Sequence, residues 1–484
     1  MPLTSKQMLS IIRNGLARTP HPKKIIVVGA GMAGLVTASL LKEAGHEVVI
    51  LEATQRVGGR IYTLREPFVD DLYLDVGAMR IPSHHELVIE YIKKFGLEIN
   101  AFVNTTPNDI IFANGVKTTR KNYQQHPDIL RYPVAPHEKG KTAGQLLLAA
   151  IQPVIDYIQQ DPLKHWQQVI RQFDRYSMET FLRYNPVGAS LSSGAVELCK
   201  VLLGLEGFPN LSFPAILREL LPLLTPNMLF YEIKGGNDHL PQAFMSQLKD
   251  NIFLNQQMIK ISQEPHQVTI HSIHTQSQRP LQTTGDLVIL TIPFTMLKFV
   301  EIEPRHSFSH NKRKAIRELH YVPSTKIGLQ FRHRFWEGEG LKGGSLATDL
   351  PIRFAYYPSH LIGSTGSGIV LASYTWEDDT LSWDNIPEPD RIRNALDNLA
   401  TVHGEQIYDD FLVGASHSWS QYRYTGGAAF SMFKPNQETD LYPSIYTPEG
   451  RVYFAGEHTS THPAWIEGAV QSGIRVANDV NYLL

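Results

Sequence analysis

The sequence predicts an α/β protein with more than one domain. Its 484 residues exceed the size at which a single hydrophobic core keeps growing. A short β-branched run at residues 25–28 precedes a glycine-rich turn, as in a buried parallel strand that leads into a helix. Further strand-like runs, at residues 268–273, 286–291 and 452–454, lie far apart in the sequence. We therefore expect a nucleotide-binding domain assembled from separated segments.

Gly29, Gly31 and Gly34 follow the first strand with the spacing G-x-G-x-x-G. The first glycine permits a tight turn, the second lets the backbone approach a pyrophosphate, and the third lets the helix pack closely on the strand. Met32 and Ala33 lie where the helix begins, and free N–H groups at a helix N-terminus favour phosphate. The turn therefore predicts a dinucleotide site.

An acidic residue ends the second strand, which is expected at residues 48–51. Glu52 and the adjacent Ala53 lie where a carboxylate can accept hydrogen bonds from ribose hydroxyls and would repel a 2′-phosphate. A glycine pair ending in Gly59 follows, and then Arg60. A nicotinamide site has no need of these residues. The stretch resembles two-dinucleotide-binding flavoproteins, and this resemblance implies that Arg60 lies near the phosphates of an extended FAD; the alternative is a solvated surface charge.

The composition bounds the class of protein. A formal net charge of −2 gives no general field that would attract nucleic acid or an anionic membrane. No run of about 18 apolar residues predicts a transmembrane helix, and residues 1–24 contain no uninterrupted apolar signal region. The single cysteine, Cys199, excludes an intramolecular disulfide and fits a reducing cytosol. We expect a cytoplasmic protein with no nucleic-acid partner and no membrane span, although secretion by another route stays open.

The middle of the chain has a helical pattern of apolar residues. From residue 141 to about 206, apolar residues recur at helical spacing, and Asp161 before Pro162 predicts an N-cap followed by a first-turn proline. We interpret this segment as a helical insertion whose apolar stripes form a core. Residues 324–376 mix strand-like alternation with turns and predict a substrate-domain sheet.

Several separated motifs occur in one order along the chain. They are the N-terminal glycine motif, GAMRIP at residues 77–82, GGNDHLP at 235–241, STKIGL at 324–329 and AGEHTSTHPAWIEGA at 455–469. With these motifs the chain resembles an FAD-dependent L-amino-acid oxidase, a branch of the flavin amine oxidase superfamily, from about residue 20 to 480. Ordered agreement of this kind is far more specific than any single motif.

The resemblance implies a Rossmann-like two-dinucleotide-binding FAD domain, a mixed-sheet substrate domain and a helical insertion domain. The FAD-binding domain is expected at residues 22–65, 235–320 and 445–484, the substrate-binding domain at 1–21, 66–118 and 321–444, and the helical domain at 119–234. Some amine oxidases hold flavin through a cysteine in their C-terminal region, which this chain lacks, so we expect non-covalent FAD. The resemblance also implies a homo-oligomer, namely a dimer.

Arg80 is the principal candidate for substrate binding. An amino acid differs from a simple amine by its α-carboxylate, which a guanidinium group can hold through two parallel hydrogen bonds. Such a clamp would orient the Cα–H bond toward the flavin. The resemblance gives Arg80 this role, with Tyr374 as the polar partner of the carboxylate. The alternatives are an ion pair of Arg80 with Asp75 and simple sheet packing of Tyr374.

Lys326 is the candidate catalytic residue. It lies inside an apolar stretch, where a lysine is costly to bury without a partner. The resemblance implies that this lysine holds a water near flavin N5, which serves reoxidation by O2 or imine hydrolysis. The alternative is a surface lysine whose stem alone is buried.

The C-terminal block is expected at the flavin. The resemblance brings Gly456 and Glu457 to the ribityl chain and pyrophosphate, and makes Trp465 a wall of the substrate site. The helix after Trp465 would direct its N-terminus at the reduced flavin. The remaining residues expected to bind flavin are Gly77, Ala78, Met79, Arg80, Met258, Ile466 and Ala469. His458 and His462 are four residues apart, but without further ligands we expect no metal site.

The resemblance implies oxidative deamination of L-amino acids. Hydride passes from Cα to flavin N5, water converts the imino acid to a 2-oxo acid and ammonia, and O2 reoxidises the flavin to give H2O2. The alternatives are a mono- or polyamine oxidase, a flavin amino-acid monooxygenase and a non-enzymatic FAD-binding module.

The residues expected to face the substrate side chain are apolar or aromatic: Trp465, Trp376, Ala428 and Phe430. They predict a preference for large apolar and aromatic amino acids. An inward-facing acid among residues 377–379 would instead favour lysine or arginine.

Overall fold

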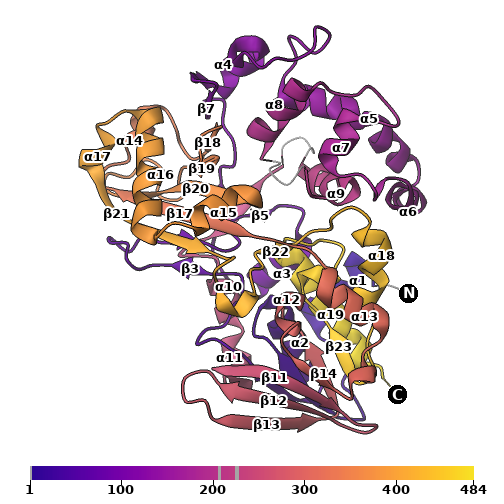
Figure 1. The fold of residues 1–484 in the computed structure, drawn as a ribbon. Helices are drawn as coiled ribbons and strands as arrows, with labels where there is room; N and C mark the ends of the chain where they lie inside the picture. Colours follow the sequence, from indigo (N-terminus) through magenta and orange to yellow (C-terminus); the bar gives the residue numbers. More distant parts are fainter. Residues whose placement is uncertain (1–2, 205–208, 224–227, 484) are drawn as a thin grey trace.

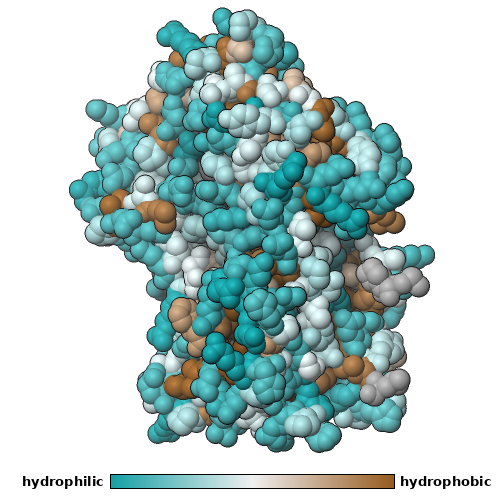
Figure 2. Space-filling view, turned by 45° about the vertical axis from the view of Figure 1, so that its right-hand side comes forward, coloured by the Kyte–Doolittle hydropathy of each residue, from teal (hydrophilic) through white to brown (hydrophobic). Residues whose placement is uncertain are grey.

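The structure, a computed structural model, describes residues 3–204, 209–223 and 228–483. Figure 1 shows a region built around a parallel sheet, a second region around a larger mixed sheet, and a cluster of helices beside it. This arrangement confirms the predicted fold class. The face shown in Figure 2 is largely hydrophilic, and its apolar side chains are scattered, as is usual for a protein surface.

The parallel sheet joins segments from distant parts of the chain. Its order is β10 (Ile252–Phe253), β2 (Glu47–Leu51), β1 (Lys24–Val28), β14 (Leu287–Leu290) and β23 (Val452–Phe454), and each neighbouring pair is parallel. Helix α2 (Met32–Glu43) packs against β1 and β2, and α19 (Ile466–Asn481) packs on α2. The other face of β1, with Ile26 and Val28, lies in one core with Met258 and Ile261 of the second sheet described below. Cover on both faces explains why the central strands are apolar runs.

A second, four-stranded sheet lies at the bottom of Figure 1. Its order is β13 (Pro280–Gly285), β12 (Val268–His274), β11 (Gln256–Gln263) and β15 (Glu301–Glu303). The run at residues 268–273 is therefore a strand, as expected, but it belongs to this sheet and not to the parallel one. Strand β11 contributes Met258, which is buried.

The mixed sheet has seven strands. Its order is β21 (Phe411–Ser418), β17 (Ser324–Phe331), β20 (Gly368–Trp376), β19 (Phe354–Tyr356), β18 (Ser345–Thr348), β7 (Ile110–Ala113) and β8 (Val116–Thr119). β17 is antiparallel to both of its neighbours, whereas β18 and β7 are parallel. Helix α16 (Glu388–His403) packs against it. Every residue of β17 is buried, which fixes the environment of Lys326.

The helical region consists of α5 (Ala143–Gln160), α6 (Pro162–Phe173), α7 (Met178–Arg183), α8 (Ser193–Leu203) and α9 (Phe213–Leu223). The predicted cap is confirmed, because the Asp161 side chain accepts a hydrogen bond from the Lys164 N–H and Pro162 is the first helical residue. The apolar stripe of α5 lies in the core, together with Cys199.

The N-terminal segment forms helix α1 (Ser5–Asn14), which packs against α3 (Glu86–Lys94). Met8 and Ile12 are its buried residues. Within the described part of the chain, no helix combines the length and apolar character needed to cross a membrane.

The remaining helices and strands connect these regions. They are β3 (Thr63–Leu64), β4 (Leu74–Asp75), β5 (Ile81–Pro82), β6 (Ile99–Phe102), α4 (Arg120–Gln125), β9 (Phe230–Ile233), α10 (His239–Ala243), α11 (Met245–Leu248), α12 (Phe294–Leu297), α13 (His310–Glu318), β16 (Tyr321–Val322), α14 (Phe335–Gly338), α15 (Asp378–Asp384), α17 (Ile407–Asp410), β22 (Phe430–Ser431) and α18 (Gln437–Tyr446).

Candidate active site

A cavity lies between the carboxyl ends of β1 and β2 and the buried strand β17. Its lining includes most of the residues that the sequence assigns to flavin and substrate: Gly29, Gly31, Met32, Ala33, Glu52, Ala53, Gly59, Arg60, Gly77, Ala78, Met258, Lys326, Tyr374, Gly456, Glu457, Trp465, Ile466 and Ala469. The cavity thus joins segments from the beginning, middle and end of the chain. We call it the main cavity.

One end of the main cavity has the geometry of a dinucleotide site. Gly29 adopts a φ of +106° and has Thr291 directly beside it, so a side chain here would be both strained and obstructed. Gly31 caps the N-terminus of α2, which opens into the cavity. Gly34 lies outside the lining, and a Cβ atom there would overlap the Gly29 carbonyl oxygen, so this glycine permits close packing.

Glu52, the acid expected at a ribose, is held in place by the backbone. Glu52 accepts hydrogen bonds from the Ala30 N–H at 2.7 Å and from the Thr54 N–H at 2.8 Å. Both bonds fix the carboxylate at the end of β2, on the cavity lining. The donor set and the α2 N-terminus therefore fit a nucleotide with a free ribose diol.

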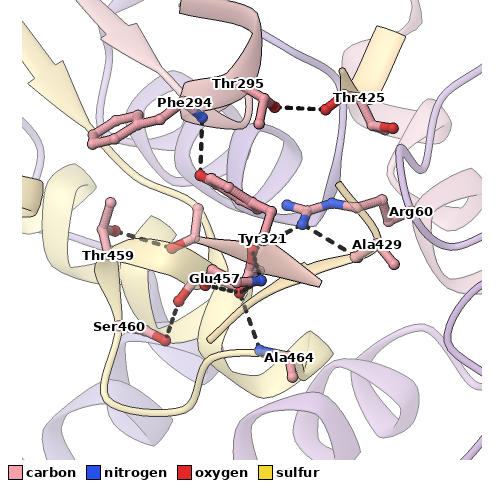
Figure 3. A network of polar contacts seen from close by, with 12 residues as sticks. Arg60, Phe294, Thr295, Tyr321, Thr425, Ala429, Glu457, Thr459, Ser460 and Ala464 are labelled. Carbon is pink, nitrogen blue, oxygen red and sulfur yellow. Dashed lines mark hydrogen bonds and ion pairs between the residues drawn. The ribbon is translucent and has the colours of Figure 1, made fainter. Parts of the chain in front are cut away.

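Arg60 forms an ion pair within the cavity wall. Its Nη1 donates to Glu457 Oε1 at 2.8 Å and to the Ala429 carbonyl oxygen at 3.3 Å (Figure 3). Glu457 also accepts hydrogen bonds from Ser431 and from the Ala464 N–H. Burial raises the pKa of Glu457, but the charge of Arg60 and these hydrogen bonds outweigh it and lower the pKa below its usual value. Arg60 is thus not a solvated surface charge.

Lys326 is buried, with 2% of its surface exposed. Its Nζ donates to the carbonyl oxygens of Gly77 at 2.7 Å and Asp75 at 3.1 Å, and lies 4.5 Å from the centre of the Tyr374 ring. Burial lowers the pKa of Lys326 to about 7, and the nearby Asp75 carboxylate only partly opposes this shift. A surface lysine with a buried stem is therefore excluded, and Lys326 can act as a neutral amine near neutral pH.

Tyr374 is the cross-strand neighbour of Lys326 in the β17–β20 pair. Its ring lies at 4.8 Å from that of Trp376, measured between centroids. Lys326 and Tyr374 both line the main cavity, so the sheet presents an amine and a phenol side by side.

Arg80 lies beside the main cavity and not on its lining, two residues after Ala78. Its Nη1 donates to Asn104 Oδ1 and, at 3.4 Å, to the Tyr356 hydroxyl oxygen. The guanidinium lies 5.4 Å from the centre of the Phe230 ring. Asp75 does not form the alternative ion pair with Arg80. Its carboxylate accepts hydrogen bonds from the Thr63 hydroxyl and the Asn237 N–H instead.

Asn104 and Tyr356 were not predicted from the sequence. Neither belongs to a recognisable motif, and each comes from a different strand or loop than Arg80. Only the assembled sheets bring them to the guanidinium.

Three further expected residues, Trp376, Ala428 and Met79, lie away from the lining. Ala428 is fully buried in the apolar core. Its N–H donates to the Thr425 carbonyl oxygen, and the N–H of the next residue donates to the Val322 carbonyl oxygen in β16. Its neighbours Ala429 and Phe430 line the cavity instead. Met79 is also buried outside the lining.

The acids that follow Trp376 do not face the main cavity. Glu377 pairs with His320 at 2.7 Å, Asp379 pairs with Arg353 at 3.1 Å, and Asp378 is exposed. Another acid contacts the wall of the main cavity: the indole Nε1 of Trp465 donates to Glu219 Oε2. Glu219 was not predicted from the sequence, although a charged pair within the otherwise apolar helix FPAILRELLPL was a usable signal.

The chain is similar to known proteins over nearly its whole length. Residues 32–481 match the model of the flavin containing amine oxidoreductases. The "Putative L-amino-acid oxidase YobN" of Bacillus subtilis (strain 168) is 52% identical over 99% of both chains. The L-amino-acid oxidase of Pseudechis australis is 36% identical over 98% of this chain and 90% of its own. That of Siganus canaliculatus is 35% identical over 98% of this chain and 88% of its own.

Solved structures agree at the level of the fold. A redesigned putrescine oxidase superimposes with a TM-score of 0.77 at 18% identity, covering 95% of this chain and 98% of its own. Cyclohexylamine oxidase from Brevibacterium oxydans IH-35A gives a TM-score of 0.76 at 19% identity, covering 95% and 99%. At such identities the likeness concerns the architecture alone.

Proposed function

Since this chain belongs to the flavin-containing amine oxidoreductases, in their L-amino-acid oxidase branch, we propose that it oxidises L-amino acids with non-covalently bound FAD. The products are a 2-oxo acid, ammonia and H2O2. The observation that carries the proposal is the main cavity itself, which joins the α2 N-terminus and Glu52 to Lys326, Tyr374 and Trp465.

The residues present fit FAD. The turn after β1 and the N-terminus of α2 would hold the pyrophosphate, and Glu52 would hold the adenosine ribose. When bound, FAD supplies the acceptor for the two electrons of the amine and passes them to O2. The N-terminus of α19, at Ile466, lies on the cavity lining, where its free N–H groups favour negative charge.

The chain's own groups bind and orient the amino acid. Arg80 would hold the α-carboxylate, because the partners of its guanidinium among the described residues, Asn104 and Tyr356, are neutral. Tyr374 would donate a second hydrogen bond to the same group, and Trp465 would close the site on the other side. Lys326, held by two carbonyl oxygens, would position water or accept a proton at Nζ.

Peroxide production with the twenty L-amino acids and their D-enantiomers tests the proposal. We expect H2O2 and equimolar 2-oxo acid with L-enantiomers only. Comparable turnover of simple amines would indicate an amine oxidase, and a carboxamide product would indicate a monooxygenase. If no amino acid gave peroxide, a non-enzymatic FAD-binding module would be the remaining alternative. Light scattering in solution tests the homodimer that the resemblance implies.

The side-chain preference is part of the proposal. The sequence predicts large apolar and aromatic substrates, and Phe430 and Trp465 on the cavity lining support that preference. Glu219 does not line the main cavity, but it accepts a hydrogen bond from Trp465 on its wall. An acid that reached the substrate side chain would instead favour lysine or arginine.

A further inference from the structure

A second cavity, which we call the side cavity, lies between the helical region and the parallel-sheet region. Its volume is about 660 Å³, a size typical of small-molecule sites. Helices α6, α9 and α18 contribute to its wall, together with the loops around residues 84–85 and 461–465. In the described part of the chain, Trp465 is the one residue that lines both cavities. Trp465 therefore lies at the boundary of the two cavities.

Glu219 is a carboxylate without a salt bridge among the described residues. It lines the side cavity and accepts one hydrogen bond, from Trp465 Nε1. The adjacent Arg218 bonds Glu438 instead and lies over the Trp166 ring, at 5.1 Å from its centre. Burial raises the pKa of Glu219 to about 7, although the Trp465 bond and the charge of Arg218 both lower it. A cation that enters the cavity would stabilise the charged form of such a buried carboxylate.

Glu438 supplies a second acceptor in the same cavity. Its side chain is 5% exposed, and Oε1 accepts from Arg218. Its Oε2 is buried and has no hydrogen-bond partner in the described structure. A buried carboxylate oxygen of this kind requires a donor, which the protein itself does not provide here.

The groups around the side cavity leave one buried carboxylate, Glu219, without a cationic partner among the described residues. Arg218 balances one of the two buried carboxylates, and Arg171 is exposed to solvent. The three histidines on the lining contribute little positive charge, because burial lowers the pKa of each: His84, His85 and His462. Burial also raises the pKa of Tyr442, which stays neutral. The cavity is therefore complementary to one additional cation.

We infer that the side cavity receives the substrate side chain and that Glu219, with Glu438, selects L-amino acids with a cationic end, arginine and lysine above all. The inference rests on the proposed function, since it needs the α-carbon in the main cavity and the side chain passing beside Trp465. A guanidinium group matches two carboxylates, because its planar donors can bond both at once.

L-Arginine and L-citrulline provide the test, because they have nearly the same shape and differ in charge. We expect kcat/KM for arginine to exceed that for citrulline at least tenfold in the wild-type holoenzyme. Glu219→Gln should bring the ratio near one, since glutamine still accepts the hydrogen bond from Trp465. Glu90→Gln, which removes a carboxylate from the surface pair with Arg13, should leave the ratio unchanged.

The ratio should also depend on pH. Deprotonated Glu219 attracts the cation, so the preference for arginine should rise from pH 6 to pH 8 in the wild type and stay flat in Glu219→Gln. Equal kcat/KM for arginine and citrulline in the wild type would overturn the inference, even if Glu219→Gln fails to fold. Peroxide with citrulline, norleucine or phenylalanine would then still support the proposed function, whereas no peroxide with any amino acid would overturn that function instead.

Discussion

Arg60 and Glu457 are 397 positions apart in the sequence and form an ion pair of 2.8 Å on the wall of the main cavity. The pair connects the segment after the second strand to the C-terminal block, and both segments line the main cavity. Glu457 also accepts a hydrogen bond from the Ala464 N–H (Figure 3). A further bond comes from Ser431 in β22, so one carboxylate fixes three separate segments.

Glu457→Gln should destabilise the protein. Removing one partner of a buried ion pair leaves an uncompensated charge on Arg60, at a cost of about 3–5 kcal/mol. The measurement is urea unfolding of the holoenzyme, followed by flavin fluorescence. Glu90→Gln breaks an exposed pair and should cost less than about 1 kcal/mol. Equal losses in the two variants would contradict a structural role of the Arg60–Glu457 pair.

Arg80→Met should retain flavin and lower kcat/KM for every L-amino acid. Loss of a charge-assisted bidentate contact to a carboxylate costs about 3–5 kcal/mol, which is a factor of a hundred or more. Arg13→Met on the surface provides the control. A decrease in kcat/KM of less than about tenfold would mean that another residue binds the substrate carboxylate.

Lys326→Met should keep much of the substrate affinity and slow one half-reaction. The Nζ group lies among the Gly77 and Asp75 carbonyl oxygens and the Tyr374 ring, where it can order water. Stopped-flow absorbance of flavin reduction and of reoxidation by O2 would locate the effect. Unchanged rates in both phases would remove Lys326 from the catalytic residues.

Lys312 provides a stability test outside the site. Its side chain is fully buried, Nζ donates to the Ile445 carbonyl oxygen at 2.9 Å, and burial lowers the pKa of the amine from 10.5 to about 7. Between these values the unfolded chain binds the proton and the folded chain does not, so stability rises with pH, by up to about 1.4 kcal/mol per unit.

Lys312→Met should therefore flatten the increase of stability above pH 7. Urea midpoints at pH 7, 8 and 9 measure the effect, with Lys6→Met on the exposed face of α1 as the control. Parallel pH profiles in the wild type and Lys312→Met would show that Lys312 titrates at its ordinary pKa.

Heat or acid should release unmodified FAD from the purified yellow protein. The single cysteine, Cys199, is buried in α8, where its Sγ contacts the Ala143 carbonyl oxygen, and it is absent from the cavity lining. Chromatography of the supernatant identifies the flavin. Yellow colour retained by the precipitated chain would mean a covalent link through another residue.

Local elements could be predicted because their causes are local. The turn at Gly29 and the cap at Asp161 depend on contacts within a few residues, and both are present as expected. The burial of Lys326 was one of two alternatives that the sequence left open, and the structure decides it because every residue of β17 is buried. The bonding partners of Arg80 could not, because Asn104 and Tyr356 reach it from separate strands and loops.

The sequence by itself determined the α/β fold, the dinucleotide turn and the order of the flavin motifs, because glycine conformation, strand periodicity and helix capping act over short distances. Only the tertiary structure decided which charges are buried together. Arg60 meets Glu457 across 397 positions and Trp465 meets Glu219 across 246. Desolvation and Coulomb energy depend on such distant neighbours, so the pKa values of the buried carboxylates follow from packing and not from motif.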